Sequence, residues 1–254
     1  LLEQDGRISE RGRLIGGLGV HPRLGMLLLE AHEHGVPQLG CDLAAILSER
    51  DPFDQRQIGS DLEARLSGIQ RHSALRDLSR QLRRKLQALG EEPKEQAAAV
   101  SAGELILAAF PEWLAQQRPN QSGRYQLRQG RGAELLPWDP LVGSPALAVA
   151  RVDMGGKNTR IQMAVALNQL TLQNIAERDG HWRDRVSWDS ERQRIRAERV
   201  LTLGELVVRR TPQPSPPAEL CRRLLIAELQ QQADLEVLPW TDQSHQLRQR
   251  LELL

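Results

Sequence analysis

The spacing of apolar residues changes once along this 254-residue chain, and this change constrains the fold more than any other feature of the sequence. Up to about residue 118, apolar side chains recur at steps of three and four, which is typical of helices that bury one face. From residue 119 they alternate with polar residues or form short runs between glycines and prolines, which is typical of strands in a small barrel or sandwich. The sequence therefore predicts an α+β chain whose helical part comes first.

Several helices are predicted before residue 118. We expect a short helix over 9–18, capped by its first serine, a second over 22–35 with proline in its first turn, and a third over 38–50. Asp51-Pro52 ends the third, because proline disfavours helical geometry in the residue before it.

Two serine-led capping boxes predict further helix starts. Ser60-Asp61-Leu62-Glu63 opens the strongest helix, which is expected to run over 60–89 with leucines on one face and arginines on the other. Ser101-Ala102-Gly103-Glu104 opens a helix through residue 109, and Phe110-Pro111 is expected to restart one through residue 117.

Short apolar segments predict the strands of the second part. A helix is expected to interrupt them over 169–178. The proline-rich segment 211–217 predicts an extended linker, and the tail is expected to form a helix over 218–232 and a last helix after Leu238-Pro239-Trp240. The expected strands lie near 125–127, 133–136, 147–152, 161–166, 186–188 and 194–208.

The sequence contains no recognisable catalytic or metal-binding pattern. A phosphate-binding loop needs G-x-x-x-x-G-K-[ST], in which backbone amides and a lysine hold the phosphates, but Gly156-Lys157 is followed by Asn158 and indicates a hairpin loop. There is no D-E-x-H segment and no Gly-x-Ser-x-Gly motif. His32 and His34 are two residues apart on a helix and face different ways. We expect no catalytic residue, no metal site and no cofactor in this chain.

Cysteine usage and hydropathy predict a cytoplasmic protein. Cys41 and Cys221 are far apart and each lies in an apolar helical context, so buried reduced thiols are expected rather than a disulfide. There is no signal peptide and no apolar run near 18 residues, so no membrane partner is expected. The sequence begins in the middle of a pattern at Leu1, as a fragment would.

Arginine supplies 31 of the 34 basic residues, and its guanidinium group binds phosphate in bidentate fashion and stacks on bases. A genomic composition bias gives the same skew. Basic groups around an aromatic on a small barrel fit the single-strand platform of oligonucleotide-binding (OB) folds. A solvated helix face and charges that protect an edge strand are the structural alternatives. The candidate groups are Arg76, Arg80, Arg83 and Arg84 in the helical part, and Arg124, Arg128, Arg131 and Arg160 around Tyr125.

Three blocks of the sequence resemble the C-terminal part of HrpB-type ATP-dependent helicases, a bacterial branch of the DEAH-box superfamily. The first block is His21-Pro22-Arg23-Leu24, and the second is CDLAAILSERD at 41–51. The third comprises FPEWLAQQR at 110–118 and GRYQLRQGRGAELLPWDPL at 123–141. The blocks follow one another in the order that the family has.

The resemblance implies a helicase accessory region, with an α+β multidomain fold. A ratchet-like helical bundle would be followed by a small antiparallel, OB-like β-barrel and a short helical tail. The RecA-like motor domains, which bind ATP and magnesium, have no counterpart in this sequence. The implied segments are 1–20 as the end of a winged-helix-like part, 21–118 as the helical ratchet-like domain, 119–210 as the barrel of the HrpB C-terminal region, and 211–254 as a proline-rich linker and helical tail.

We therefore expect an accessory region of an RNA helicase that contacts single-stranded RNA or DNA and the motor domains of the same protein, and that contributes to domain closure. The alternative is a protein–protein interaction module that does not itself bind nucleic acid. An aromatic content of 3% is low for a platform on which several bases stack. Arg50, flanked by Glu49 and Asp51, could instead pair with a carboxylate of the fold. The arginines expected at the strand are Arg50, Arg71 and Arg76 in the helical part, and Arg124 and Arg131 on the barrel.

Overall fold

The computed structural model describes residues 6–89, 100–155, 159–192, 194–231 and 241–251. The segments Gly156-Lys157 and Leu238-Pro239-Trp240 lie outside these ranges. The chain forms two compact units: the first contains Leu1–Gly180 and Thr202–Val208, and the second contains His181–Leu201 and Arg209–Leu254. Among the described residues, no helix has the length and apolar character needed to cross a bilayer.

The first unit begins with the three predicted helices, α1 (Glu10–Leu18), α2 (Pro22–Glu33) and α3 (Pro37–Ser48). Ser9 caps α1, and prolines occupy the first turns of α2 and α3, where a missing N–H costs nothing. α2 packs against both α1 and α3. The fully buried side chains of this bundle include Leu18, Leu27, Leu28, Leu43 and Ile46.

The single helix expected over 60–89 is wrong. The chain forms α4 (Gln55–Ile58), α5 (Leu62–Gly68), the 3-10 helix η1 (Ile69–Arg71) and α6 (Ser73–Gln87). Asp61 caps α5 in place of Ser60, which hydrogen-bonds to a distant loop. His72 is extended (φ −115°, ψ 102°), and this geometry separates η1 from α6. α6 still buries its leucine face, as predicted, by packing on α3.

The capping box of Ser101 and Glu104 forms as predicted at the start of α7 (Ala102–Ala109). The helix expected over 110–117 is wrong, because a 3-10 turn, η2 (Pro111–Trp113), leads directly into strand β1 (Leu114–Gln117). β1 pairs with a strand on each side, and its first two residues are buried. Strand pairing therefore overrides the local helical pattern.

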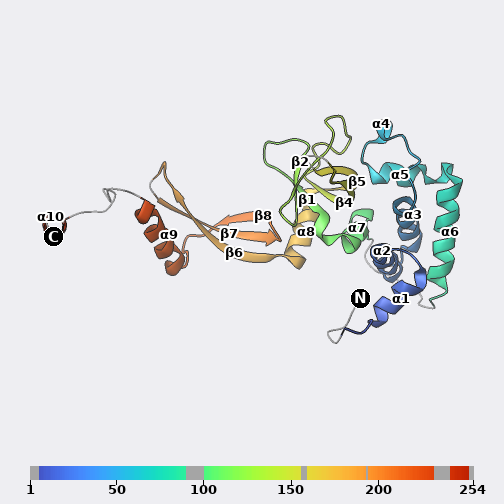
Figure 1. Ribbon diagram of the computed structural model, residues 1–254, viewed down its shortest axis with the longest axis horizontal. Helices are drawn as coiled ribbons and strands as arrows, with labels where there is room; N and C mark the ends of the chain where they lie inside the picture. Colours follow the sequence, from blue (N-terminus) through green and yellow to red (C-terminus); the bar gives the residue numbers. More distant parts are fainter. Residues whose placement is uncertain (1–5, 90–99, 156–158, 193, 232–240, 252–254) are drawn as a thin grey trace. The chain divides into compact units, whose positions relative to one another are not determined.

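Five strands close into a barrel in the order β1-β2-β3-β5-β4. Figure 1 shows this region beside α7. Neighbouring strands are antiparallel except β3 and β5, which are parallel, so the barrel is not wholly antiparallel as expected. α7 packs on β4 and β5 and also on α2, which places it between bundle and barrel. The other strands are β2 (Arg124–Leu127), β3 (Gly132–Glu134), β4 (Ala146–Asp153) and β5 (Thr159–Leu167), and the interior contains Tyr125, Leu127, Leu147, Val149 and Ile161.

The barrel ends earlier than residue 210, because a closed barrel has no free edge to which more strands could be added. After β5 comes α8 (Gln169–Asp179), the predicted interrupting helix, and then a separate three-stranded sheet in the order β6-β7-β8. Helix α9 packs on β6. The bounds are β6 (His181–Asp189), β7 (Arg194–Leu203), β8 (Leu206–Pro212), α9 (Ala218–Gln231) and α10 (Asp242–Leu251).

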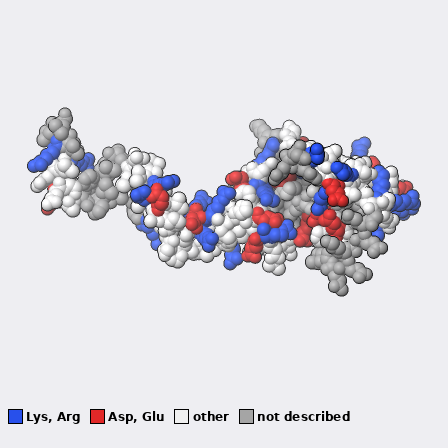
Figure 2. All heavy atoms as spheres, turned by 90° about the horizontal axis from the view of Figure 1, so that it is seen from below, with Lys and Arg blue, Asp and Glu red and all other residues white. Residues whose placement is uncertain are grey.

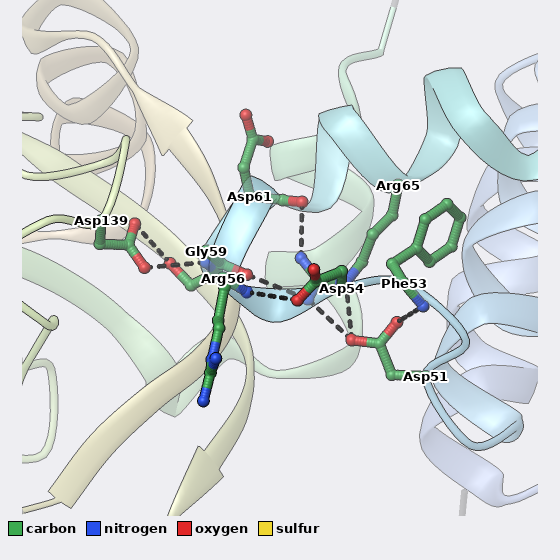
Figure 3. A network of polar contacts seen from close by, with 9 residues as sticks. Asp51, Phe53, Asp54, Arg56, Gly59, Asp61, Arg65 and Asp139 are labelled. Atoms are coloured by element: carbon green, nitrogen blue, oxygen red, sulfur yellow. Dashed lines mark hydrogen bonds and ion pairs between the residues drawn. The ribbon is translucent and has the colours of Figure 1, made fainter.

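A buried polar network joins the helical part to the barrel within the first unit (Figure 3). Asp139, in the loop between β3 and β4, accepts hydrogen bonds from the Ser60 amide at 2.8 Å and from the Ser60 hydroxyl at 3.0 Å. The Ser60 carbonyl in turn accepts from the Ala164 amide of β5 at 2.9 Å. The segment before α5 is thereby attached to the barrel wall.

Arg65 of α5 completes this network, as Figure 3 shows. Its side chain is fully buried, and its guanidinium pairs with Asp51 at 2.7 Å. It also donates to the carbonyls of Gly59 at 3.0 Å and Asp61 at 2.8 Å. Bundle and barrel consequently belong to one compact unit, whereas the sequence places a division between them at residue 119.

Candidate nucleic-acid interface

Three arginines of the barrel line one pocket of about 420 Å³. Arg118 follows β1, Arg124 begins β2 and Arg131 precedes β3, so each comes from a different segment. Arg124 and Arg131 are predicted from the sequence, and the structure brings them together. Arg118 could not be predicted, because the strand before it was not recognised in the sequence and no other pattern indicated a site there. The pocket, which we name the arginine pocket, is also lined by Tyr125, Gly132, Ala133, Glu134 and Thr159.

The backbone fixes where these guanidinium groups lie. The Arg118 amide donates to the Arg124 carbonyl at 2.9 Å, which ties the loop to the start of β2. Gly132 leaves room for the Arg118 side chain, since a Cβ there would lie 3.2 Å from its Nη2 atom. Nη1 of Arg131 lies 3.3 Å from the sulfur of Met154.

The arginine pocket carries an excess of positive charge. Glu134 is opposite Arg124 in the β2–β3 register, where opposite charges attract. In the described part of the chain, the side chains of Arg118 and Arg131 form no ion pair. The Thr159 hydroxyl is buried and has no hydrogen-bond partner among the described residues.

Tyr125, the aromatic residue expected beside these arginines, does not offer a stacking surface. Its side chain is fully buried in the barrel core. The hydroxyl donates toward the carbonyls of Leu141 at 3.1 Å and Ser144 at 3.0 Å. Burial, reinforced by the charge of Asp139, raises the pKa of Tyr125 to about 12. Its role is therefore structural.

The three arginines predicted in the helical part are exposed and lie away from the arginine pocket. Arg50 follows α3, Arg71 ends η1 and Arg76 lies on α6. Asp51 pairs with Arg65, and the described residues show no ion pair to Arg50. The alternative that Arg50 is occupied by a neighbouring carboxylate therefore has no support in these contacts.

Arg76 lines a polar pocket of about 430 Å³ together with Arg80 and Gln70, next to α3. The floor of this pocket is a hydrogen-bond network in which Ser79 donates to Asp42 at 2.6 Å and Gln38 donates to the same carboxylate at 2.9 Å. The network attaches α6 to α3, so Arg76 lies on a helix that is held against the bundle.

A larger cavity of about 630 Å³ is lined by residues of α1, α2, α7, β1 and α8, and its charged groups have both signs. Arg178 and Asp179 hydrogen-bond to each other there. This bond raises the pKa of Arg178 and lowers the pKa of Asp179. Figure 2 shows the same mixing of basic and acidic side chains over the face that it presents.

The sheet of the second unit carries further arginines that the sequence reasoning did not single out. Glu198 pairs with Arg196 at 2.6 Å and with Arg210 at 3.0 Å. Burial raises the pKa of Glu198, but the Arg210 hydrogen bond and the nearby positive charges outweigh it, so the net shift is downward. The Arg199 guanidinium lies 5.6 Å from the ring centre of Trp182. These groups are largely engaged within their own sheet.

The described residues contain no group of three or more His, Cys, Asp or Glu side chains that could hold a metal ion. Cys41 and Cys221 are free thiols. Cys41 is fully buried, and burial raises its pKa to about 12, which keeps it a thiol rather than a nucleophilic thiolate at neutral pH.

The family model described as "ATP-dependent RNA helicase HrpB, connector region" matches residues 181–213, which contain the β6-β7-β8 sheet. The ATP-dependent RNA helicase HrpB of Escherichia coli (strain K12) is 30% identical over 247 residues, which are 96% of this chain and 29% of that protein. Two crystal structures of E. coli HrpB, titled as a DExH-box NTPase and as a DEAH/RHA helicase, superpose with TM-scores of 0.69 and 0.66. They are 29% and 28% identical to this chain and align with 98% of it. The chain thus spans about 30% of the length of these relatives.

Proposed function

Because this chain corresponds to a C-terminal part of an HrpB-type helicase, we propose that it is an accessory region of a DEAH-box ATP-dependent RNA helicase and contacts a single strand of RNA or DNA. ATP and magnesium would be bound by RecA-like motor domains of the complete protein. This region would dock on those domains and contribute to their closure. The two free cysteines fit a cytoplasmic location.

The arrangement of arginines on the barrel is the observation that carries the proposal. The strand order and the parallel β3–β5 pair fit an OB fold. OB folds bind oligonucleotides on strands 2 and 3 and on the loop between strands 1 and 2. Arg118 lies in that loop, Arg124 begins strand 2 and Arg131 directly precedes strand 3. Three cations therefore meet on the face that such a fold uses.

The exposed arginines of the helical part would add contacts outside the barrel. Arg50 follows α3, Arg71 ends η1 and Arg76 lies on α6. All three belong to the part of the sequence that resembles the ratchet. Their exposure supports this proposal, since a phosphate contact needs a guanidinium that the fold leaves accessible.

A salt titration of single-strand binding tests the proposal. Each phosphate contact releases counterions, so replacing a contacting arginine by alanine should weaken binding and reduce the salt slope by about one. We expect this for Arg124→Ala and Arg131→Ala without loss of thermal stability. Arg222→Ala, on the exposed pair with Glu219 of α9, is the matched control and should leave the slope unchanged.

The alternative is a protein-interaction module, and the exposed Leu225 and Ile226 of α9 favour it. Exposed apolar side chains on a helix suit a protein partner. If every arginine variant retains the wild-type salt slope, the nucleic-acid proposal fails and this alternative takes its place.

A further inference from the structure

We propose that the arginine pocket holds a single backbone phosphate of the strand and reads no base, so that the barrel contacts nucleic acid through phosphate alone. This inference rests on the proposed function and specifies how the barrel contributes to it. Its ligand is a phosphodiester, or a phosphate compound that imitates one, and the Arg118 and Thr159 side chains are new members of the site.

The charges of the arginine pocket favour an anion. Three arginines and one carboxylate, Glu134, line the pocket. No ion pair to Arg118, Arg124 or Arg131 is found among the described residues, although Glu134 is opposite Arg124 in the β2–β3 register. A guanidinium presents two parallel N–H groups, which match two oxygens of one phosphate. Two such forks around one pocket can neutralise a phosphodiester.

Thr159 adds a neutral donor to this cationic lining. Only 2% of the residue is exposed, and its hydroxyl has no hydrogen-bond partner within the described chain. Leaving a buried hydroxyl without a hydrogen-bond partner is unfavourable. An acceptor oxygen that enters the pocket could satisfy it, and phosphate supplies acceptors only.

The walls of the pocket favour a phosphate over a base. Its volume of about 420 Å³ admits one nucleotide-sized group, so the preference comes from the lining residues and not from size. Tyr125 is the only aromatic residue among the described residues of the lining and is fully buried, so none of these residues offers a ring for stacking. The described lining residues include no Asn or Gln amide, and guanidinium groups that hold phosphate oxygens are not free to pair with a base edge.

Oligonucleotides with altered bases or an altered backbone test the inference on the whole chain. Fluorescence anisotropy would compare oligo-dT, an abasic strand of equal length with the same phosphates, and an oligo-dT with uncharged methylphosphonate linkages. We expect the abasic strand to bind within about twofold of oligo-dT. The methylphosphonate strand should bind at least tenfold more weakly, and inorganic pyrophosphate should compete.

Variants assign the effect to the pocket. Arg118→Ala and Arg131→Ala should each weaken oligo-dT and the abasic strand by the same factor, about tenfold. Thr159→Val, which keeps the shape of the side chain, should weaken both by a smaller factor. Arg118→Lys should recover part of the loss, and Arg222→Ala should change neither. Melting temperatures of all variants, measured by circular dichroism, distinguish lost contacts from lost folding.

The outcomes separate the two proposals. If the arginine variants weaken binding but the abasic strand binds tenfold or more weakly than oligo-dT, the barrel reads bases and this inference is wrong, while the proposed function stands. If folded Arg118, Arg124 and Arg131 variants bind oligo-dT like the wild type, the barrel does not hold the strand and both proposals fail for this site. If the wild type binds the strand and Thr159→Val binds it equally well, the Thr159 hydroxyl is not part of the site.

Discussion

At the scale of single residues, long-range polar contacts are the feature that could not be predicted from the sequence. Arg65 lies in a row of basic residues and looks like part of a solvated helix face, yet its side chain is fully buried against Asp51. The two residues are 14 positions apart and are brought together only by the turn between α3 and α5. Arg124 and Arg131, in contrast, could be singled out from the sequence, because they lie close to Tyr125 among the glycines of the strand region.

Arg65→Ala should be strongly destabilising. It leaves the Asp51 carboxylate buried without its partner, and it also removes the donors to the Gly59 and Asp61 carbonyls. We expect the free energy of unfolding in urea to fall by about 3–5 kcal/mol. Arg80→Ala, which removes an exposed pair with Asp77, is the control and should cost only about 0–1 kcal/mol. Equal effects of the two variants would contradict the network described for Arg65.

Alkaline pH should destabilise the first unit. Burial raises the pKa of Cys41 from 9.0 to about 12 and that of Tyr125 from 10.0 to about 12. Both groups stay protonated in the fold while the unfolded chain already loses protons, so their contribution to stability is constant below about pH 9 and falls between about pH 9 and 12. Urea midpoints measured across this range should decline, and Cys41→Ala should make the decline shallower. A midpoint that stays constant to pH 11 would show that neither group is held as described.

At the scale of elements, the sequence predicts best where local chemistry decides. Ser101 and Glu104 form the expected capping box, and Ser9 caps its helix, because a cap involves only the first turn. The predictions for 60–89 and 110–117 are wrong, because distant partners decide there. Ser60 hydrogen-bonds to Asp139 rather than to its own helix, and 114–117 pairs with two strands.

Gly59 follows the last residue of α4 and has a backbone conformation that only glycine adopts without strain. Its φ of 57° and ψ of −138° are unfavourable for other residues, and a Cβ there would lie 2.5 Å from Cδ of Pro140. We expect Gly59→Ala to lower the free energy of unfolding by at least about 1–3 kcal/mol. Gly16→Ala, inside α1 with no atom within 4 Å of the added Cβ, should be neutral or slightly stabilising. Thermal denaturation of the two variants side by side checks the difference.

At the scale of the whole molecule, the α+β class and the order of helices before strands could be read from the sequence, but the division into units could not. The Ser60–Asp139 contact joins the bundle to the barrel across segments distant in sequence, and the Arg65–Asp51 contact holds α5 to the turn after α3. The candidate site could be predicted only in part, because its residues also come from segments that the fold brings together. Arg118 belongs to it through the fold of a loop, whereas Arg50, Arg71 and Arg76 occupy other surfaces.

The last prediction concerns the activity of the chain as a whole. Hydrolysis of ATP needs backbone amides and a lysine around the phosphates, together with carboxylates that hold magnesium. The sequence has no complete phosphate-binding loop and no D-E-x-H segment. The chain alone should therefore release phosphate from ATP no faster than buffer, with or without single-stranded RNA, in a coupled phosphate assay. A contaminating ATPase is the main source of error, and it would survive any single substitution in this chain. Turnover above background that Arg118→Ala or Arg131→Ala abolishes in a folded protein would instead place a nucleotide site in the barrel, and the accessory role would have to be abandoned.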